Sequence, residues 1–446
     1  MKNKILTGFL LVLIGGWGSL SAQNVGSNYA RQVNTLIGTK GVGLTSGYLY
    51  PGATYPYGMV QFTPSYFSKR SGFVINQLSG GGCEHMGNFP TFPVKGKLKM
   101  SPDNILNYRI NISEKKGHAG YYEAKVQEDI HAKLTVTERT GMASYEYPAD
   151  QQYGTVIIGG GISATPIEQA AIVITAPNKC EGYAEGGNFC GLRTPYKVYF
   201  VAEFDTDALE SGTWKRNELK PNTTFAEGEY SGVYFTFDVD KKKNVQYKIG
   251  VSYVSVENAR ENLKAENTGW DFLQIQNQAE SKWNHYLGKI EVEGTNPDRT
   301  TQFYTHLYRS FIHPNVCSDV NGEYMGADFR VHKSRSKHYT SFSNWDTYRT
   351  QIQLLSILDP EVASDIVISH QLFAEEAGGA FPRWVMANIE TGVMQGDPTP
   401  ILISNAYAFG ARNYDPKPIW KIMRKGAEEP GTMSQNIEVR PGLKQY

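Results

Sequence analysis

The hydrophobic pattern of the chain changes once, about halfway along its 446 residues, and this change limits the fold more than any other feature. Before it, apolar and polar residues alternate, as in VQYKIGVSYVS, where Val245, Tyr247 and Ile249 share one face. A period of two residues is typical of half-buried strands, and Gly, Asn and Asp separate such runs. With no helical period between them, these strands predict a large antiparallel β-sandwich, which we assign to residues 24–265.

After the change, apolar residues recur every three or four positions. Residues 266–294 predict a linker helix that ends in a short strand, and residues 295–446 predict successive helices separated by polar loops. Pro297 is suited to open the first of these helices, and Gly378 and Gly379 to end the third. The architecture expected is therefore multidomain, β followed by α, with too few helices to close a ring.

The charge balance limits the possible partners. Lys plus Arg number 44 and Asp plus Glu number 44, so no net field would draw the chain to nucleic acid. Tyrosine, with 28 residues, suits flat surfaces that stack on sugar rings, although ordinary tyrosines of a β-rich protein explain the same number. No Ser-His-Asp order, phosphate loop or HExxH helix is present, so serine-hydrolase, kinase and zinc-protease chemistry lack support.

The first 22 residues have the pattern of a signal peptide. Lys2 and Lys4 precede an apolar run, and small residues lead to Ala22, after which we expect cleavage. No later run of about twenty apolar residues could span a bilayer. We therefore expect an exported protein, periplasmic or secreted, with no membrane span.

The four cysteines fit no zinc-binding spacing. They are Cys83, Cys180, Cys190 and Cys317. In an oxidising compartment the nearby pair Cys180 and Cys190 could close a disulfide loop, and it could equally stay reduced. We take this pair as the disulfide candidate.

Several segments, in order along nearly the whole chain, together resemble glycoside hydrolase family 92, a family of exported bacterial α-mannosidases. The segments are VNTLIGTKGVG, YPGATYPYGMVQFTP, LSGGGCEHMGNFPTFP, GYYEAKVQEDIHAKLTVTERTGMASYEYP, VSYVSVENARENLKAENTGWDF, FSNWDTYRTQIQLLSILDP and PRWVMANIETGVMQGDPTPILISNAY. No single motif is decisive, but their order and spacing are.

The resemblance implies a β-sandwich packed on an (α/α)6 toroid, with a sugar site at their interface and a calcium ion that binds the terminal mannose. It also implies inverting hydrolysis by a Glu acid and an Asp base, whose carboxyl groups lie roughly 6.5–9.5 Å apart to admit water. In the family these two residues and most calcium ligands come from later helices of the toroid. The catalytic pair is therefore expected beyond residue 446, and the metal ligands are not assigned.

Asp346 is the first candidate for contact with a sugar. A carboxylate at the start of an inner helix can accept charge-assisted hydrogen bonds from sugar hydroxyls, with Trp345 as an apolar wall and Arg349 orienting the carboxylate. Alternatively, Asp346 only stabilises the helix N-terminus, which contributes about 0.3–1 kcal/mol.

Three further residues are substrate-binding candidates. Glu84 and His85 follow three glycines in GGGCEHMGN and could recognise the leaving-group sugar, or simply face water. A metal site made of Cys83, Glu84 and His85 has weak support, because adjacent residues seldom aim at one ion. Glu390 lies in a loop between helices and is assigned to the architecture of the site, while Asp397 precedes a proline and suits a turn.

Two functions follow. The first is an exo-acting, calcium-dependent, inverting α-mannosidase that trims terminal α-linked mannose from N-glycans or mannans, present here as an N-terminal fragment that is inactive alone. The second is a non-catalytic glycan-binding protein made of the sandwich and a partial helical array. In both, mannose-containing glycans are the expected partners.

Overall fold

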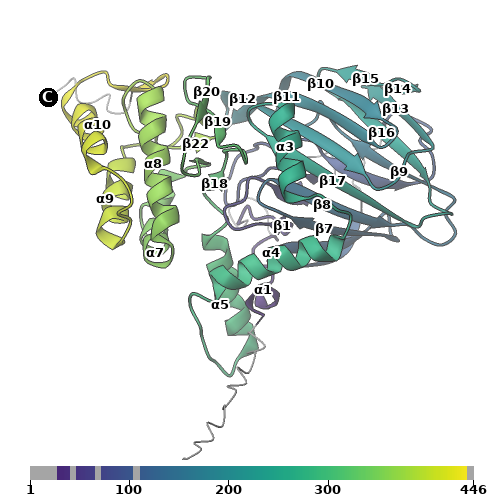
Figure 1. Ribbon diagram of the computed structural model, residues 1–446, viewed down its shortest axis with the longest axis horizontal. Helices are drawn as coiled ribbons and strands as arrows, with labels where there is room; N and C mark the ends of the chain where they lie inside the picture. The colour runs from purple at the N-terminus through teal and green to yellow at the C-terminus, as the bar shows by residue number, and fades with distance from the viewer. Residues whose placement is uncertain (1–27, 41–46, 66–71, 104–110, 439–446) are drawn as a thin grey trace, which may run out of the picture.

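The computed structural model describes residues 28–40, 47–65, 72–103 and 111–438 (Figure 1). The expected signal peptide lies outside the described residues. Within them, no helix is both long enough and apolar enough to cross a membrane.

The N-terminal half forms two antiparallel sheets packed face to face, as the alternating pattern predicts (Figure 1). The first sheet runs β1 (Ala53–Thr54), β2 (Gln61–Pro64), β3 (Phe73–Val74), β4 (Thr91–Lys95), β9 (Tyr153–Ile158), β16 (Ser231–Asp238), β13 (Glu210–Lys215), β14 (Glu218–Pro221). The second runs β15 (Phe225–Glu227), β10 (Ile167–Ala176), β11 (Lys179–Phe189), β12 (Leu192–Phe204), β17 (Asn244–Ser252), β8 (Thr140–Glu146), β7 (Ile130–Val136), β6 (Tyr121–Val126), β5 (Ile112–His118).

The inner faces of the two sheets form one apolar core. Val245, Tyr247 and Ile249, which the period of two placed on one face, are all fully buried in it. Aromatic side chains dominate, and the rings of Phe73 and Tyr145 stack with centroids 6.4 Å apart. Burial of one such side chain contributes about 1.5–3 kcal/mol, so this core stabilises the sandwich.

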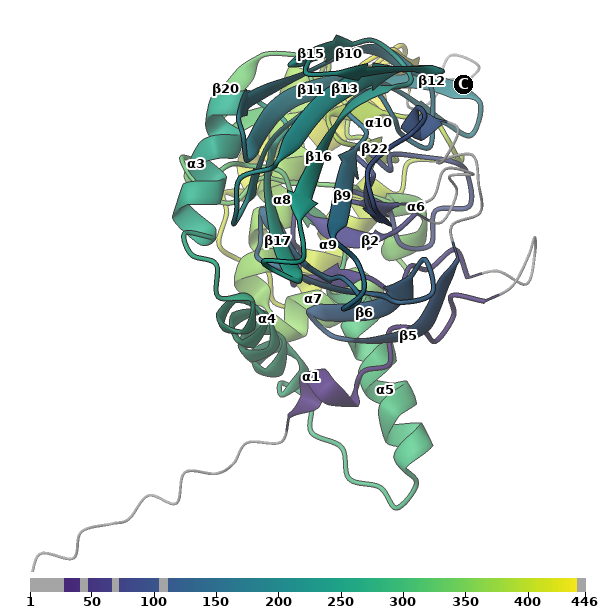
Figure 2. The same ribbon diagram turned by 90° about the vertical axis from the view of Figure 1, so that its right-hand side faces the viewer.

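Three helices join the sandwich to the rest of the chain (Figure 2). Helix α3 (Val256–Glu266), capped by the Ser255 side chain, packs on β17 and β12, and the sequence analysis did not predict it. Helix α4 (Phe272–Leu287) is the expected linker helix, but the strand expected after it is absent from residues 288–296. At the N-terminus, α1 (Tyr29–Gln32) packs against α4.

The remaining helices confirm the helical period and do not close a ring within the described residues (Figure 1). They are α5 (Pro297–Ser310), α6 (Asn344–Thr347), α7 (Gln351–Leu358), α8 (Pro360–Glu376), α9 (Thr399–Phe409) and α10 (Pro416–Glu428). Pro297 opens α5, and Asn296 caps it by accepting from the N–H groups of Asp298 and Arg299.

The apolar pattern through Trp345 and Leu355 is divided between two helices, α6 and α7. The carbonyl oxygen of Tyr348 accepts hydrogen bonds from the side chains of Gln353 (3.0 Å) and Asn405 (3.2 Å). These side-chain amides bond a backbone carbonyl that lies between α6 and α7. The series of helical backbone hydrogen bonds is interrupted at this point.

Short hairpins, which the helical period gave no reason to expect, fill the space between the helices and the sandwich. Their pairs are β18 (Asn315–Val316) with β21 (Tyr339–Thr340), β19 (Glu323–Met325) with β20 (Val331–Lys333), β22 (Val385–Met386) with β23 (Ile389–Glu390), and β24 (Met433–Ser434) with β25 (Ile437–Glu438).

Candidate functional site

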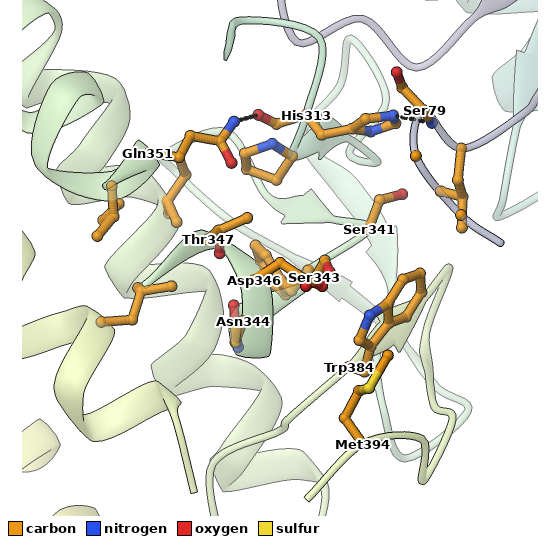
Figure 3. Close-up of a pocket in the computed structure, with 18 of the residues that line it drawn as sticks. Ser79, His313, Ser341, Ser343, Asn344, Asp346, Thr347, Gln351, Trp384 and Met394 are labelled. Carbon is orange, nitrogen blue, oxygen red and sulfur yellow. Dashed lines mark hydrogen bonds between the residues drawn. The ribbon is translucent and has the colours of Figure 1, made fainter. Parts of the chain in front are cut away.

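A cavity of about 490 Å³ lies where loops of the sandwich meet the helices (Figure 3). The sandwich contributes residues 78–83 and the tip of the β11–β12 hairpin. The helical part contributes residues 341–344, Asp346, Thr347, Trp384 and Met394. The deeper wall is apolar and consists of Ile352, Leu355, Ile366 and Leu402. The cavity therefore combines an apolar interior with a polar edge, and its volume falls within the range of about 300–1,000 Å³ typical of small-ligand sites.

A disulfide joins the two sandwich segments at the cavity wall. Cys83 pairs with Cys190, with Cα atoms 5.2 Å apart, and both residues line the cavity. The predicted Cys180–Cys190 pair is wrong. Cys180 lies near the start of strand β11 and Cys190 follows its end, so ten residues at about 3.3 Å each separate them. Cys180 is a free thiol in the sandwich core, and burial raises its pKa.

His85 is buried in the glycine-rich loop and is not among the residues that line the cavity. Its Nε2 accepts from the N–H of Leu78 at 2.9 Å, which leaves Nδ1 to donate to the carbonyl of Cys83 at 2.6 Å. Burial lowers the pKa of His85 to about 4, so the ring is neutral. A Cβ on Gly81 would lie 2.9 Å from this ring, so glycine is required there. Glu84 is exposed and does not line the cavity either.

His313 connects the same loop to the helical part. Its Nε2 accepts from the N–H of Ser79 at 2.8 Å, and its Nδ1 contacts the side-chain oxygen of Asn315 at 2.7 Å (Figure 3). Burial lowers the pKa of His313 to about 4. A second neutral histidine thus fixes the position of the loop across the domain junction.

Asp346 lines the cavity from the first turn of α6 (Figure 3). Its carboxylate accepts from the hydroxyl of Ser343, and its own N–H donates to the carbonyl of Ser343 at 3.0 Å. The residue is exposed. The geometry is therefore compatible both with helix capping and with contact to a ligand. Among the described residues, no protein group bonds the second oxygen of the carboxylate.

The neighbours of Asp346 do not have the roles predicted for them. Trp345 does not line the cavity. The guanidinium of Arg349 lies over the ring of Trp345 at 4.9 Å and over that of Tyr348 at 5.0 Å, an arrangement of the cation–π type. Arg349 therefore packs on aromatic faces and forms no ion pair with Asp346 among the described residues.

The aromatic wall of the cavity is Trp384, which the sequence analysis did not single out (Figure 3). Its ring stacks on Phe189 of the sandwich hairpin, with centroids 4.5 Å apart and planes at 29°. The only sequence signal was a tryptophan in a loop of the PRWVMANIE segment, and its partner is almost 200 positions earlier. This pair bridges the two halves of the molecule beside the disulfide.

Glu390 lies beneath the wall and is not among the residues that line the cavity. It is 6% exposed. Its carboxylate accepts from the N–H groups of Arg383 (2.5 Å) and Gly392 (2.9 Å), and more weakly from that of Trp384 (3.4 Å). Burial raises the pKa of Glu390 despite these bonds. The residue folds the loop that carries Trp384, in agreement with a role in the architecture of the site.

His370 and Asn344 hold α6 in place at the rear of the cavity. The Nε2 of His370 lies 3.1 Å from the side-chain oxygen of Asn344, and the Asn344 amide donates to the hydroxyl of Thr399 at 2.7 Å. The His370 ring stacks on Phe342 at 3.9 Å, and burial lowers its pKa to about 4. These contacts join α6 to α8 and α9 and so set the position of Asp346.

One group of the described residues could hold a metal ion. Ligand atoms of Asp328, His332 and Glu376 lie within 4.8 Å of one another. Protein groups already bond them, because His332 contacts Asp328 at 2.9 Å and Tyr324 donates to Glu376 at 2.7 Å. None of the three lines the cavity.

This group fits the calcium ion implied by the resemblance poorly. Calcium takes six to eight oxygen ligands, whereas one of these three ligands is a nitrogen. Among the described residues that line the cavity, Asp346 is the one carboxylate. The described residues that line the cavity therefore do not include the several carboxylates typical of a calcium site.

The described chain combines a β-sandwich and a helical array, with a cavity at their junction. Family models agree: the glycosyl hydrolase family 92 N-terminal domain matches residues 32–252, and the catalytic domain of that family matches residues 258–446. The chain belongs to glycoside hydrolase family 92.

Solved structures of this family share the fold. An α-mannosidase of the family from Bacteroides thetaiotaomicron superposes with a TM-score of 0.81 at 24% identity, over 89% of this chain and 56% of its own. An inverting mannosidase from the same organism gives 0.81 at 23%, over 94% and 57%. A curated relative, an uncharacterized secreted glycosidase of Arthroderma benhamiae, is 26% identical over 76% of this chain and 48% of its own length. The chain thus spans about half the length of these relatives.

Proposed function

We propose that the chain is part of an exo-acting, calcium-dependent, inverting α-mannosidase that removes terminal α-linked mannose from N-glycans or mannans. The observation that carries this proposal is the junction cavity, whose apolar rear wall and polar edge suit the end of a glycan chain. A structural relative described with the inhibitor mannoimidazole is a family 92 α-mannosidase, which supports mannose as the bound sugar.

Asp346 is the proposed sugar-binding carboxylate. It reaches the cavity from a helix that His370 and Asn344 hold in place, and the Ser343 hydroxyl orients one of its oxygens. A carboxylate can accept hydrogen bonds from two adjacent hydroxyls of one sugar, and such charge-assisted bonds are about twice as strong as neutral ones. Trp384 would supply the flat apolar surface for the carbon-bearing face of the ring.

Catalysis by inversion needs two carboxyl groups, an acid and a base, in addition to the proposed sugar-binding Asp346. The family's catalytic-domain model covers residues 258–446, so the expectation that the acid and base lie beyond residue 446 has no support from that match. Inverting hydrolysis nevertheless requires an acid and a base on opposite faces of the sugar, and the described cavity wall holds one carboxylate. We therefore propose that this chain alone binds mannose and does not hydrolyse mannosides.

Calcium dependence is proposed for the longer enzyme on the strength of the family resemblance. Asp346 is the one carboxylate among the described residues that line the cavity, whereas calcium takes six to eight oxygen ligands. We also propose that the protein is exported, on the basis of the leader pattern at residues 1–22 and of the curated relative described as secreted.

The test compares this chain with a full-length version on α-linked mannobioses, with and without a calcium chelator. We expect the full-length protein to release mannose with inversion and to lose activity when calcium is chelated. NMR of the newly formed anomer measures the configuration. This chain should bind methyl α-mannoside in calorimetry and release no mannose. Retention of configuration, or full activity after chelation, would contradict the proposal.

A second candidate function, non-catalytic glycan binding, is favoured by the single carboxylate at the cavity. It predicts that the full-length version also binds mannose and cleaves none of the α-linked mannobioses. Hydrolysis by the full-length version excludes it.

A further inference from the structure

We propose that a groove along α4, distinct from the junction cavity, is a second binding site for a neutral oligosaccharide. Two hollows of about 770 and 700 Å³ adjoin there, and both are lined by Tyr55 and Gln278, so they form one continuous groove. None of the residues that line this groove lines the junction cavity. It runs from Asp271, before α4, to Lys337 in the segment after β20.

The floor of the groove is a row of polar side chains on one face of α4. Gln274, Asn277, Gln278 and Ser281 follow helical spacing, and all four are exposed. The opposite face of the helix, with Ile275, Ala279 and Trp283, is buried. No protein group within the described residues bonds the side-chain amides of Gln274, Asn277 and Gln278. Each amide offers both a donor and an acceptor, which matches neighbouring sugar hydroxyls.

The facing wall carries charges that neutralise one another. Arg139 contacts Glu138 and Glu266, each at 2.7 Å, and Lys337 also pairs with Glu138. Over the whole groove, four carboxylates are matched by four cationic side chains. The carboxylates are Asp271, Glu138, Glu266 and Asp319, and the cations are Lys282, Arg139, Arg335 and Lys337. The groove therefore offers no net electrostatic attraction to an anionic or cationic ligand. A neutral polyhydroxylated ligand does not depend on such attraction.

Tyr55 supplies the aromatic surface where the two hollows meet. Its ring is half-buried and lines both hollows. Burial, together with the nearby Glu138 and Glu266, raises the pKa of Tyr55 to about 12, so the phenol stays neutral and can donate a hydrogen bond. One flat ring with flanking amides is the combination that stacks on and bonds a pyranose.

The experiment measures retardation of the purified chain in native gels that contain soluble mannan, laminarin or polygalacturonate. The Asp346→Asn background removes the contribution of the junction cavity. In that background, Asn277→Ala with Gln278→Ala should weaken the retardation by a neutral polysaccharide about tenfold, since two hydrogen-bonding amides are lost. Asn217→Ala, an exposed amide in the β13–β14 turn, is the matched control and should change nothing.

The near-isosteric pair Asn277→Asp and Gln278→Glu distinguishes loss of the amide donors from a change in folding. These substitutions keep the shape of the helix face and remove the amide donors, so they should weaken retardation to a similar extent with unchanged melting. Retardation equal in all variants, retardation by polygalacturonate alone, or none by mannan or laminarin would each overturn the proposal.

Discussion

The sandwich core and the domain junction are both buried, but different kinds of contact hold them together. The core consists of apolar and aromatic side chains such as Phe73 and Tyr247, which are fully buried. The junction depends on neutral histidines and one buried carboxylate that bond backbone groups, as His313 and Glu390 do. Apolar burial stabilises without requiring one geometry, whereas directed hydrogen bonds fix positions and respond to charge. The core therefore provides stability and the junction provides geometry.

The sandwich exposes a few large apolar side chains, such as Leu209 and Phe225, and the helical part exposes more of them. Large apolar side chains are exposed on its helices, namely Ile357 on α7, Ile401, Tyr407 and Phe409 on α9, and Trp420 on α10. Exposed apolar patches favour association. We therefore expect the sandwich to be the more stable of the two parts.

The largest effect should come from breaking the core. Phe73→Ala removes a ring that contacts Phe62 and Tyr145, and such truncations lower the free energy of unfolding by about 3–5 kcal/mol. Denaturant titration followed by circular dichroism measures it. Trp384→Ala, at the junction, should instead lower only the transition of the helical part. A single, equally shifted transition in both variants would show that the two regions unfold as one unit.

The next effect tests the covalent link between the sandwich hairpin and the glycine-rich loop. Cys83→Ser should lower stability by about 2–4 kcal/mol, because the disulfide restricts a long loop of the unfolded chain. Thermal melting with and without reductant measures it, and reductant should have no further effect on this variant. Cys180→Ala is the control and should keep the sensitivity to reductant. Loss of that sensitivity in Cys180→Ala would restore the pair first expected from sequence.

A smaller effect, confined to the site, is expected for Asp346→Asn. The substitution keeps shape and removes a charged acceptor, so binding of methyl α-mannoside should weaken about ten- to a hundredfold, equivalent to about 1.5–3 kcal/mol. Calorimetry measures the affinity, and the melting temperature should stay nearly unchanged. Normal binding would leave Asp346 with helix capping alone, through Ser343.

Local signals in the sequence were enough for the architecture but not for the site. The period of two in VQYKIGVSYVS and the prolines that open α5 and α8 act within a few residues, so the strands and most helices were predicted. The Cys83–Cys190 pair, the stacking of Phe189 on Trp384 and the bond from Ser79 to His313 each join segments more than 100 residues apart. No local pattern encodes such contacts. His85 and Glu390 both bond backbone groups, and a polar residue in a loop looks the same in sequence whether it bonds backbone or ligand.

The smallest effect concerns the protonation of one junction histidine. Burial lowers the pKa of His370 to about 4 in the folded protein, below its value of about 6.5 in the unfolded chain. As the pH falls through 6.5, the unfolded chain binds a proton that the folded ring does not, so stability is lost between about pH 6.5 and pH 4. Between pH 7 and pH 5 this one group lowers the free energy of unfolding by about 2 kcal/mol.

His370→Gln should therefore reduce the pH dependence of the free energy of unfolding by that amount. Denaturant titration at both pH values measures it. The variant should also be less stable at pH 7, because it loses the contacts with Asn344 and Phe342. An equal pH dependence of the free energy of unfolding in wild type and His370→Gln would mean that the junction does not hold this ring neutral. The contrast between an uncharged core and a charge-sensitive junction would then not hold for this buried histidine.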